Sequence, residues 1–267
     1  MPVITPIDDP YDPRIEGYRQ IRERDLAGRH GAFVAEGEVV LRALARSRFQ
    51  TLSLLIAEQR LAAQADLLAG FAADTPVYSA SQVVMDQIVG FPIHRGLLGL
   101  GRREDGPTAA QALAALPERA LVLALFGIGN HDNMGGLMRN AAAFGVDLVL
   151  LDATCCDPLY RKAIRVSVGA ALVTPFARLD SENDPIAVLE GAGFTPIALS
   201  PSGSEQLKDL ERPLRAALLL GAEGPGLPAA ILARSRTVSI PMAGGFDSLN
   251  VATTSGIVLH HLASRSG

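Results

Sequence analysis

The sequence predicts an α/β protein built on parallel strands, and three observations carry that prediction. Uninterrupted apolar runs such as 120–126 (ALVLALF) and 216–220 are typical of strands that helices cover on both faces. Glycine-rich turns follow such runs directly, and a helical pattern follows the turn. Hydrophobic residues make up 48% of the 267-residue chain, which is ample for a buried core. We therefore expect strands and helices to alternate along most of the chain.

The composition argues against several classes of protein. A formal net charge of −4 disfavours a protein that coats nucleic acid through bulk charge. However, 22 of the 24 basic residues are arginine, whose planar guanidinium binds phosphate better than the lysine ammonium does. No apolar run approaches the roughly 18 residues that a membrane helix needs. The acidic, proline-rich N-terminus is unlike a signal peptide. We expect a cytoplasmic protein without a membrane partner.

The chain has two cysteines, Cys155 and Cys156, which are adjacent. Neighbouring residues cannot supply a spaced metal site or a framework of disulfides. We expect buried, reduced thiols and no bound metal.

The first part of the chain predicts a small α/β domain over 12–101. Residues 1–12 are proline-rich and predict a loose leader. Residues 12–29 are polar and helical in type; they form either a solvated helix with ion pairs or a face that contacts phosphates. Alternating patterns predict strands at 32–35, 52–57, 75–78 and 96–100 and helices at 38–45, 61–71 and 82–88.

A linker at 102–118, rich in Arg, Gly, Pro and Ala, precedes a second domain at 119–267. The predicted strands of this domain are 120–126, 148–151, 194–199, 216–220 and 238–242. One helix is expected to end at Gly145, and its N-cap is Asp132 or Asn133. Another follows the cysteines, and a mostly buried C-terminal helix begins near Asp247 or Ser248.

Two of the glycine-rich turns, 221–227 and 243–249, are typical of a ligand site. Ligands of open α/β sheets bind at the carboxyl ends of the strands, and glycine lets the backbone approach a ligand closely. The sequence has no G-x-G-x-x-G after a strand, no P-loop, no zincin motif and no nucleophile elbow. A nucleoside-like ligand held by backbone groups suits these turns better than a phosphate cradle.

Three motifs bring polar residues together with these turns. They are NHDNMGGLMRN at 130–140, LLLGAEGPGLP at 218–228 and SIPMAGGFDSLNVATTSGI at 239–257. In order and spacing they resemble the SpoU/TrmH family of RNA ribose 2′-O-methyltransferases, in the SPOUT superfamily. The resemblance covers 118–264 strongly and includes RVSVGA at 165–170. FVAEG at 33–37 is similar to the small substrate-binding domain often found ahead of the catalytic one.

The resemblance implies a Rossmann-like SPOUT domain whose C-terminal segment forms a trefoil knot, preceded by a small L30e-like domain that binds the RNA substrate. It also implies a homodimer that uses S-adenosylmethionine as methyl donor and needs no metal. By motif, Leu199, Gly221, Ile240 and Leu249 would contact the donor. The family's polar functional positions match Arg139, Asn133, Glu223, Ser248 and Asn250. Asn140 stands where the family commonly has Thr.

Two roles are open for Arg139. The family's matching arginine is usually proposed as the base, but a guanidinium with a pKa above ~12 is a poor base. The alternative is that Arg139 orients the ribose by binding the neighbouring phosphate. In the first domain, the arginines expected to contact RNA phosphates are Arg14, Arg19, Arg22 and Arg29.

Two other functions stay open: an RNA-binding or ribosome-assembly factor with little activity, and a SPOUT enzyme that methylates a base nitrogen. The sequence does not identify the target as ribosomal or transfer RNA.

Overall fold

The computed structural model describes residues 3–19, 31–244 and 248–264. Contacts divide the chain into two compact units. The first comprises Met1–Asp105 and Asp157–Val173, and the second comprises Gly106–Cys156 and Thr174–Gly267. The first boundary lies inside the predicted linker 102–118. Segment 157–173, which the sequence places in the second domain, groups with the first unit, so the chain passes between the units three times.

The first unit contains a mixed five-stranded sheet of order β1-β4-β3-β5-β2. Its strands are β1 (Ile4–Pro6), β2 (Ala32–Glu36), β3 (Thr51–Ala57), β4 (Val77–Ala80) and β5 (Leu97–Arg102). Strand β5 runs antiparallel to both β2 and β3, whereas β1 and β3 pair in parallel with β4. The prediction of a loose leader was therefore wrong for residues 4–6, because pairing with β4 supplies the hydrogen bonds that proline-rich sequence lacks locally.

The helices of this unit are η1 (Pro13–Tyr18), α2 (Glu38–Ala45), α3 (Glu58–Leu61), η2 (Ala62–Gln64), α4 (Ala65–Leu68), α5 (Gln82–Val89), α8 (Arg161–Val166) and α9 (Ala170–Val173). Ser81 caps α5, and Gly90 ends it with a φ of 83°. The helix predicted over 12–29 is a short 3₁₀ turn at η1, after which Arg19 is extended. Residues 20–30 lie outside the described residues.

Apolar side chains from the sheet and η1 form the core of the first unit. Ile15 and Tyr18 are fully buried beside residues such as Leu55 and Leu98. The hydroxyl of Tyr18 donates to the Ser53 carbonyl oxygen at 2.8 Å, which satisfies its polar end.

The second unit contains a seven-stranded sheet of order β10-β12-β9-β11-β6-β7-β8, and all of its strand pairs are parallel. Its strands are β6 (Ala120–Leu125), β7 (Leu148–Leu151), β8 (Phe176–Arg178), β9 (Thr195–Leu199), β10 (Glu205–Gln206), β11 (Arg215–Leu220) and β12 (Arg236–Ser239). The parallel α/β sheet expected from the apolar runs is confirmed. Strands β8 and β10 were not predicted, because each is too short to leave a periodic signal.

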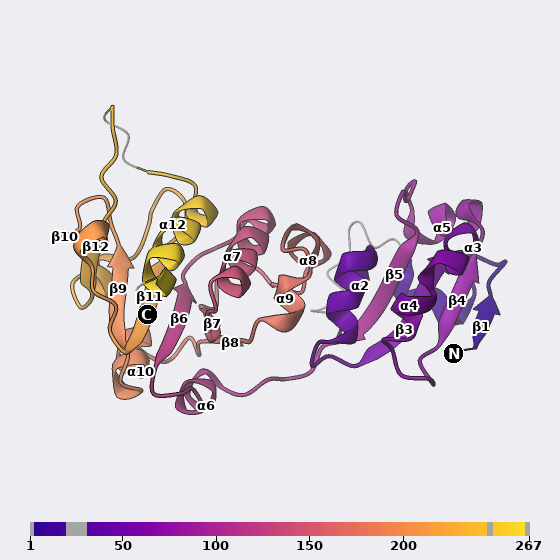
Figure 1. Cartoon of the computed structure of the whole chain (residues 1–267), viewed down its shortest axis with the longest axis horizontal. Coiled ribbons are helices and arrows are strands. Elements are labelled where there is room, and N and C mark those ends of the chain that lie inside the picture. The colour runs from indigo at the N-terminus through magenta and orange to yellow at the C-terminus, as the bar shows by residue number, and fades with distance from the viewer. Residues whose placement is uncertain (1–2, 20–30, 245–247, 265–267) are drawn as a thin grey trace. The chain divides into compact units, whose positions relative to one another are not determined.

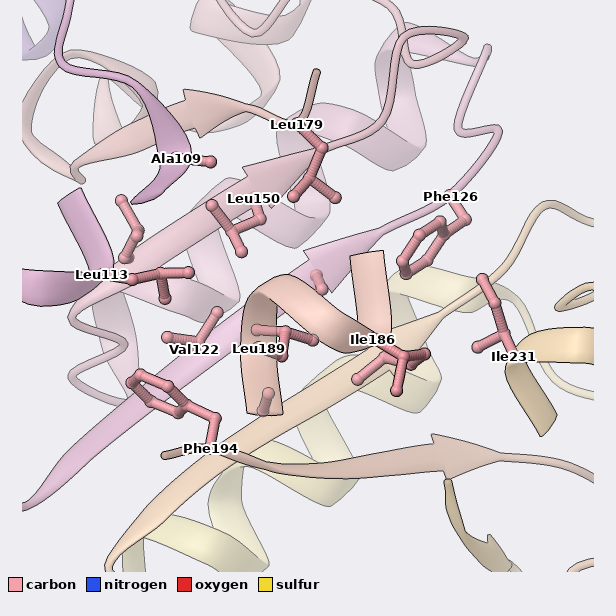
Figure 2. Close-up of a cluster of buried hydrophobic side chains, with 14 of the residues drawn as sticks. Ala109, Leu113, Val122, Phe126, Leu150, Leu179, Ile186, Leu189, Phe194 and Ile231 are labelled. Atoms are coloured by element: carbon pink, nitrogen blue, oxygen red, sulfur yellow. The ribbon is translucent and has the colours of Figure 1, made fainter. Parts of the chain in front are cut away.

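Helices cover both faces of this sheet. They are α6 (Ala109–Ala114), α7 (His131–Ala143), α10 (Pro185–Gly191), η3 (Leu207–Asp209), α11 (Ala229–Leu232) and α12 (Val251–Ser264). Leu113 of α6 and Leu189 of α10 lie near Val122 of β6 in a buried cluster that also includes Ile231 of α11 (Figure 2). The long helices α7 and α12 pack side by side (Figure 1). Within the described parts of the chain, no helix combines the length and apolar character needed to cross a membrane.

Candidate active site

Three adjacent parallel strands bring the glycine-rich turns to one edge of the second sheet. In the order β12-β9-β11, Leu199 pairs with Val238 and Ala198 pairs with Leu219. The carboxyl ends of these strands therefore lie at the same level. Of the residues predicted to bind the donor, Leu199 ends β9, Gly221 follows β11, and Ile240 follows β12.

The turn after β11 is held closed by a close approach of its own backbone. A Cβ on Gly221 would lie 2.3 Å from the carbonyl carbon of Gly226, so no larger residue fits. The Gly226 amide donates to the Ala222 carbonyl oxygen at 3.0 Å, and Gly224 and Gly226 have φ values of 88° and 68°. Sequence reasoning missed Gly203, where a Cβ would lie 2.4 Å from the Val238 carbonyl carbon. The turn after β9 thus lies directly against β12.

Some peptide groups at this edge have no partner within the described chain. The amides and carbonyls of Gly221, Ile240 and Leu249 make no hydrogen bond to other described residues. A small ligand can use such groups, because backbone N–H and C=O groups are strong donors and acceptors. The predicted donor-binding turns therefore contain main-chain groups that could bind a ligand.

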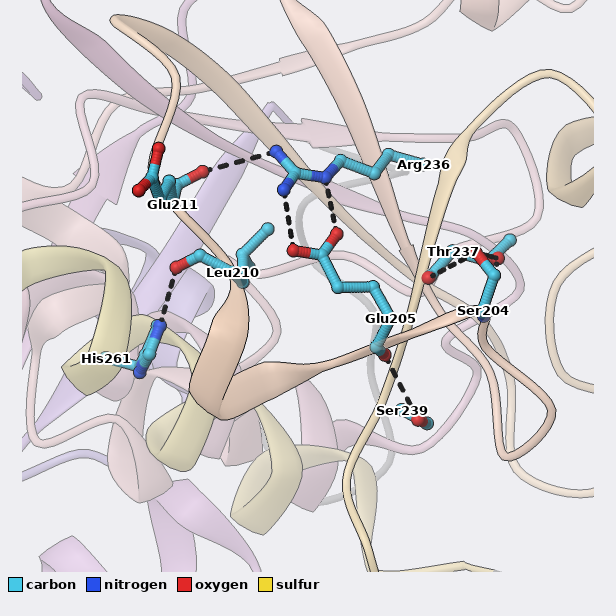
Figure 3. Close-up of polar contacts among 8 residues, drawn as sticks. All are labelled: Ser204, Glu205, Leu210, Glu211, Arg236, Thr237, Ser239 and His261. Carbon is cyan, nitrogen blue, oxygen red and sulfur yellow. Dashed lines mark hydrogen bonds and ion pairs between the residues drawn. The ribbon is translucent and has the colours of Figure 1, made fainter.

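Polar contacts fasten the segment after β9 to β12 and α12 (Figure 3). The guanidinium of Arg236 donates to both carboxylate oxygens of Glu205 at 2.6 Å, a bidentate geometry. Ser239 Oγ donates to the Glu205 carbonyl oxygen at 3.1 Å. On α12, His261 Nε2 lies 3.0 Å from the Leu210 carbonyl oxygen. These contacts hold the segment after β9 in place beside β12 and α12.

Asn250 joins two further parts of the site through its carboxamide. Its nitrogen donates to Asn133 Oδ1 at 2.8 Å and to Glu223 Oε1 at 2.9 Å. Its oxygen accepts from the amides of Ala252 and Thr253, at 3.0 and 3.2 Å, and so caps α12. Both hydrogens of the amide group are used, which fixes its orientation. The structure therefore brings together three of the five predicted polar residues.

The helix caps differ from the prediction. Asn250, rather than Ser248, caps α12, and Asp247 lies outside the described residues. Asn130, rather than Asp132 or Asn133, caps α7, since its side chain accepts from both of their amides. These predictions were wrong because several consecutive residues suit a cap and only the local backbone selects one.

The other two predicted polar residues are Arg139 and Ser248, and Arg139 makes no hydrogen bond or ion pair with this cluster. Arg139 is exposed, and its side chain has no hydrogen bond or ion pair with any described residue. It lies six positions after Asn133, which places it about 120° away around α7. Ser248 is exposed and lies two residues before Asn250. The guanidinium of Arg139 is thus exposed and has no partner among the described residues.

Asn140 is a residue that the sequence left without a role. It lies seven positions after Asn133 and shares its face of α7. Its carboxamide nitrogen donates to the Ala252 carbonyl oxygen at 2.6 Å and to Ser255 Oγ at 2.8 Å. A Cβ on Gly136 would lie 2.7 Å from the Ala252 Cβ, so the two helices are in close contact there. The Asn in place of the family's Thr reaches across to α12.

Two of the predicted RNA-contacting arginines are engaged locally. Arg14 binds the Asp12 carboxylate, at 2.9 Å from Nε and 2.5 Å from Nη2, and this lowers the pKa of Asp12 to about 2. Arg19 donates to the carbonyl oxygens of Pro10 and Asp12 and lies 5.3 Å from the centre of the Tyr11 ring. Arg22 and Arg29 lie outside the described residues.

Neither Cys155 nor Cys156 forms a disulfide with a described residue. Burial raises the pKa of Cys155 to about 12, and its Sγ accepts from the Ile128 amide at 3.3 Å. The described residues contain no cluster of His, Cys, Asp or Glu suited to a metal ion.

Comparison with known proteins places this site in a family. The model of the SpoU rRNA methylase family matches residues 120–260. The chain belongs to this family. It is 40% identical over 274 residues to an uncharacterized tRNA/rRNA methyltransferase of Mycobacterium bovis, covering 99% of this chain and 93% of the relative. A counterpart from Mycobacterium tuberculosis is 39% identical with the same coverage.

Solved structures share the fold over nearly the whole chain. An AdoMet-bound rRNA methyltransferase from Sinorhizobium meliloti matches with a TM-score of 0.84 at 22% identity, covering 99% of both chains. The SpoU methyltransferase AviRb from Streptomyces viridochromogenes, in complex with the cofactor AdoMet, matches with a TM-score of 0.80 at 21% identity, covering 96% of this chain and 99% of that one. At these identities the likeness establishes the fold of this SpoU family member.

Proposed function

We propose that this RNA methyltransferase transfers a methyl group from S-adenosylmethionine to a ribose 2′-hydroxyl of ribosomal or transfer RNA. The observation that carries the proposal is the Asn133–Asn250–Glu223 cluster, which includes a residue of the glycine-rich turn after β11, in a SpoU family chain. The sequence motifs that contain these three residues also predict this reaction, through their resemblance to the family.

The residues present fit the proposed methyl donor. Gly221, Ile240 and Leu249 offer main-chain groups that no described residue pairs with, and Leu199 ends the strand between β12 and β11. S-adenosylmethionine supplies a methyl group on a positively charged sulfur, which loses its charge as the methyl leaves. The chain's own part is to hold the donor in line with the acceptor and to exclude water, which can supply much of the rate acceleration. Two structural neighbours were solved with this molecule bound.

Asn250 and Glu223 help to position the RNA ribose that accepts the methyl group. The Asn250 amide holds the Glu223 carboxylate beside the first turn of α7, where the helix dipole favours negative charge. Arg139 projects from α7 without a partner among the described residues and carries the planar fork that suits phosphate. We assign Arg139 to hold the substrate phosphate and ribose, with stabilisation of the developing alkoxide as its second effect.

Further features belong to the same proposal. In the sheet, β9 lies between β11 and β12. After β12 the chain turns back, and α12 packs beside α7. This path suits the trefoil knot of the superfamily. Leu249 and Ile257 are 43% and 41% exposed at the start and on the outer side of α12, which suits a homodimer.

The first unit would be the L30e-like, RNA-binding part. Because its substrate is cellular RNA, the protein would act in the cytoplasm.

Labelled donor identifies the reaction. The full-length protein is incubated with methyl-labelled S-adenosylmethionine and total RNA, and the RNA is digested to nucleosides. A labelled 2′-O-methyl nucleoside is the expected product. A base-methylated nucleoside would show a base-nitrogen methyltransferase, and RNA binding without label would show an RNA-binding or assembly factor.

The role of Arg139 is tested at saturating donor. Arg139→Lys keeps the positive charge but loses the planar guanidinium that can donate two parallel hydrogen bonds. Turnover should therefore fall at least ten-fold while donor affinity stays constant. The matched control is Arg42→Lys, since Arg42 is an exposed arginine paired with Glu38 on α2. Near-normal turnover in Arg139→Lys would defeat the assignment.

A further inference from the structure

The segment 157–173 carries the motif RVSVGA, and neither the donor turns nor the asparagine cluster uses it. Its residues form helices α8 and α9 and belong to the first unit. The chain contains no Asp or Glu from 158 to 179, whereas α8 contains Arg161, Lys162 and Arg165. The segment is thus locally basic in a protein whose net charge is negative.

The inner side of the segment is fixed to the first unit. Arg161 donates to Glu36 Oε2 at 3.1 Å, with the two side chains only 17% and 8% exposed, and lies 5.0 Å from the centre of the Phe91 ring. Asp157 forms an ion pair with Arg103. Gly169 fits closely against α2, since a Cβ there would lie 2.7 Å from the Ala43 Cβ. These contacts hold the segment in one position on its own unit.

The turn between α8 and α9 carries backbone strain at an exposed valine. Val168 has a φ of 55°, and among the described residues it alone combines a positive φ with a side chain. A β-branched residue in this region is an outlier, which Gly or Asn would relieve. The side chain is 39% exposed, so its burial offers limited compensation for the strain.

Neighbouring hydrogen bonds hold the turn in this strained form. The Gly169 amide donates to the Ile164 carbonyl oxygen at 3.0 Å. The buried Ser167 donates through Oγ to the same carbonyl at 2.9 Å and accepts from the Ala171 amide at 3.2 Å. Strain that surrounding structure maintains is concentrated at ligand-contacting and catalytic positions in proteins.

The outward residues suit a polyanion. Arg165 is exposed, and its side chain has no hydrogen bond or ion pair with any described residue; Lys162, three positions earlier, is also exposed. The two cations share one side of α8. We propose that Lys162, Arg165 and Val168 form a surface that contacts the RNA substrate, with the cations on phosphates and the valine against a sugar or base. This surface rests on the proposed function and adds to it the place where the first unit holds RNA.

The proposal is tested by binding of the full-length protein to labelled total tRNA and to labelled total rRNA over a series of salt concentrations. Arg165→Gln should weaken binding several-fold and reduce the slope of log affinity against log salt by about one. Arg165→Lys should restore both. Val168→Asn, which relieves the strain, should weaken RNA binding while the melting temperature holds or rises. The matched control is Arg46→Gln, which removes one exposed arginine from the same unit and should leave the affinity within two-fold of wild type and the slope unchanged.

The outcomes separate this surface from the reaction. If Arg165→Gln and Val168→Asn bind RNA as the wild type does, the surface is wrong, while formation of a methylated nucleoside would leave the proposed function standing. If the variants weaken binding to DNA duplex and RNA equally, the surface is a general polyanion contact and the proposal of an RNA surface fails. If the wild type binds no RNA at low salt and methylates none, both the proposed surface and the proposed function fail. For the proposed surface, KM for RNA should rise while donor affinity by calorimetry is unchanged.

Discussion

The Asn140 carboxamide nitrogen of α7 donates to the Ala252 carbonyl oxygen of α12 at 2.6 Å. The same nitrogen also donates to Ser255, which is completely buried. This contact sets the position of one helix along the other. Because Asn133 and Asn250 meet at the N-terminal end of the same helix pair, the contact at Asn140 also determines how those two residues approach each other.

Removing the Asn140 amide should therefore cost stability as well as activity. Asn140→Ala leaves the buried Ser255 with one partner fewer, and the expected loss in free energy of unfolding is about 1–3 kcal/mol. Urea denaturation monitored by circular dichroism measures it. The control is Asn183→Ala at an exposed asparagine, which should change stability by less than about 0.5 kcal/mol. Equal effects of the two changes would mean that the contact contributes nothing.

Substitutions at Asn250 separate its two roles. Asn250→Asp keeps an oxygen to cap α12 but directs a second oxygen at the Glu223 carboxylate and at Asn133 Oδ1. We expect a stable protein, since Asp caps helices as well as Asn, with methyl transfer reduced at least ten-fold. Asn250→Ala loses the cap as well and should lower stability by about 1 kcal/mol. A fully active Asn250→Asp enzyme would show that the amide hydrogens are unnecessary.

A methyl group at Gly221 should open the turn after β11. The Cβ of Gly221→Ala would lie 2.3 Å from backbone atoms of Gly226, which cannot move aside as a flexible side chain would. We expect donor affinity, measured by calorimetry, to fall at least ten-fold. Gly129→Ala is the matched control, because a Cβ at Gly129 meets nothing within 4 Å. Unchanged affinity in Gly221→Ala would remove this turn from the donor site.

The Cys155 thiol should resist alkylation until the protein unfolds. Its pKa is raised from 9.0 to about 12 by burial, so it stays protonated near neutral pH. Since the unfolded thiol ionises first, its contribution to stability is complete below about pH 9 and is lost as pH rises towards 12. Iodoacetamide labelling at pH 8, followed by mass spectrometry, should modify Cys155 only in urea. Rapid labelling of the native protein at Cys155 would contradict this burial.

The sequence predicted the second sheet well because its strands are buried on both faces. The apolar runs at β6, β7 and β11 have the same boundaries in the structure to within a residue. Short edge strands are different. Strands β1, β8 and β10 are two or three residues long and form through pairing with distant parts of the chain, which local patterns do not encode.

The site was predicted only as a set of residues. Motif spacing placed Asn133, Glu223 and Asn250 at strand ends and helix starts, which implies proximity but not bonding. The roles of Asn130 and Asn140 depend on which asparagine meets which helix, and this follows from the packing of α7 on α12. The strain at Val168 has no sequence signal, since valine is the residue least expected at a positive φ.

The grouping of residues 157–173 with the first unit makes the two units interleaved along the gene. No single truncation separates them: a fragment starting at the linker would still carry Arg161, now deprived of the Glu36 carboxylate that neutralises it. A fragment ending at the linker would likewise leave Glu36 as a buried charge. A single crossover between relatives would join Glu36 from one parent to Arg161 from another, so exchange of the whole first unit requires three coordinated junctions.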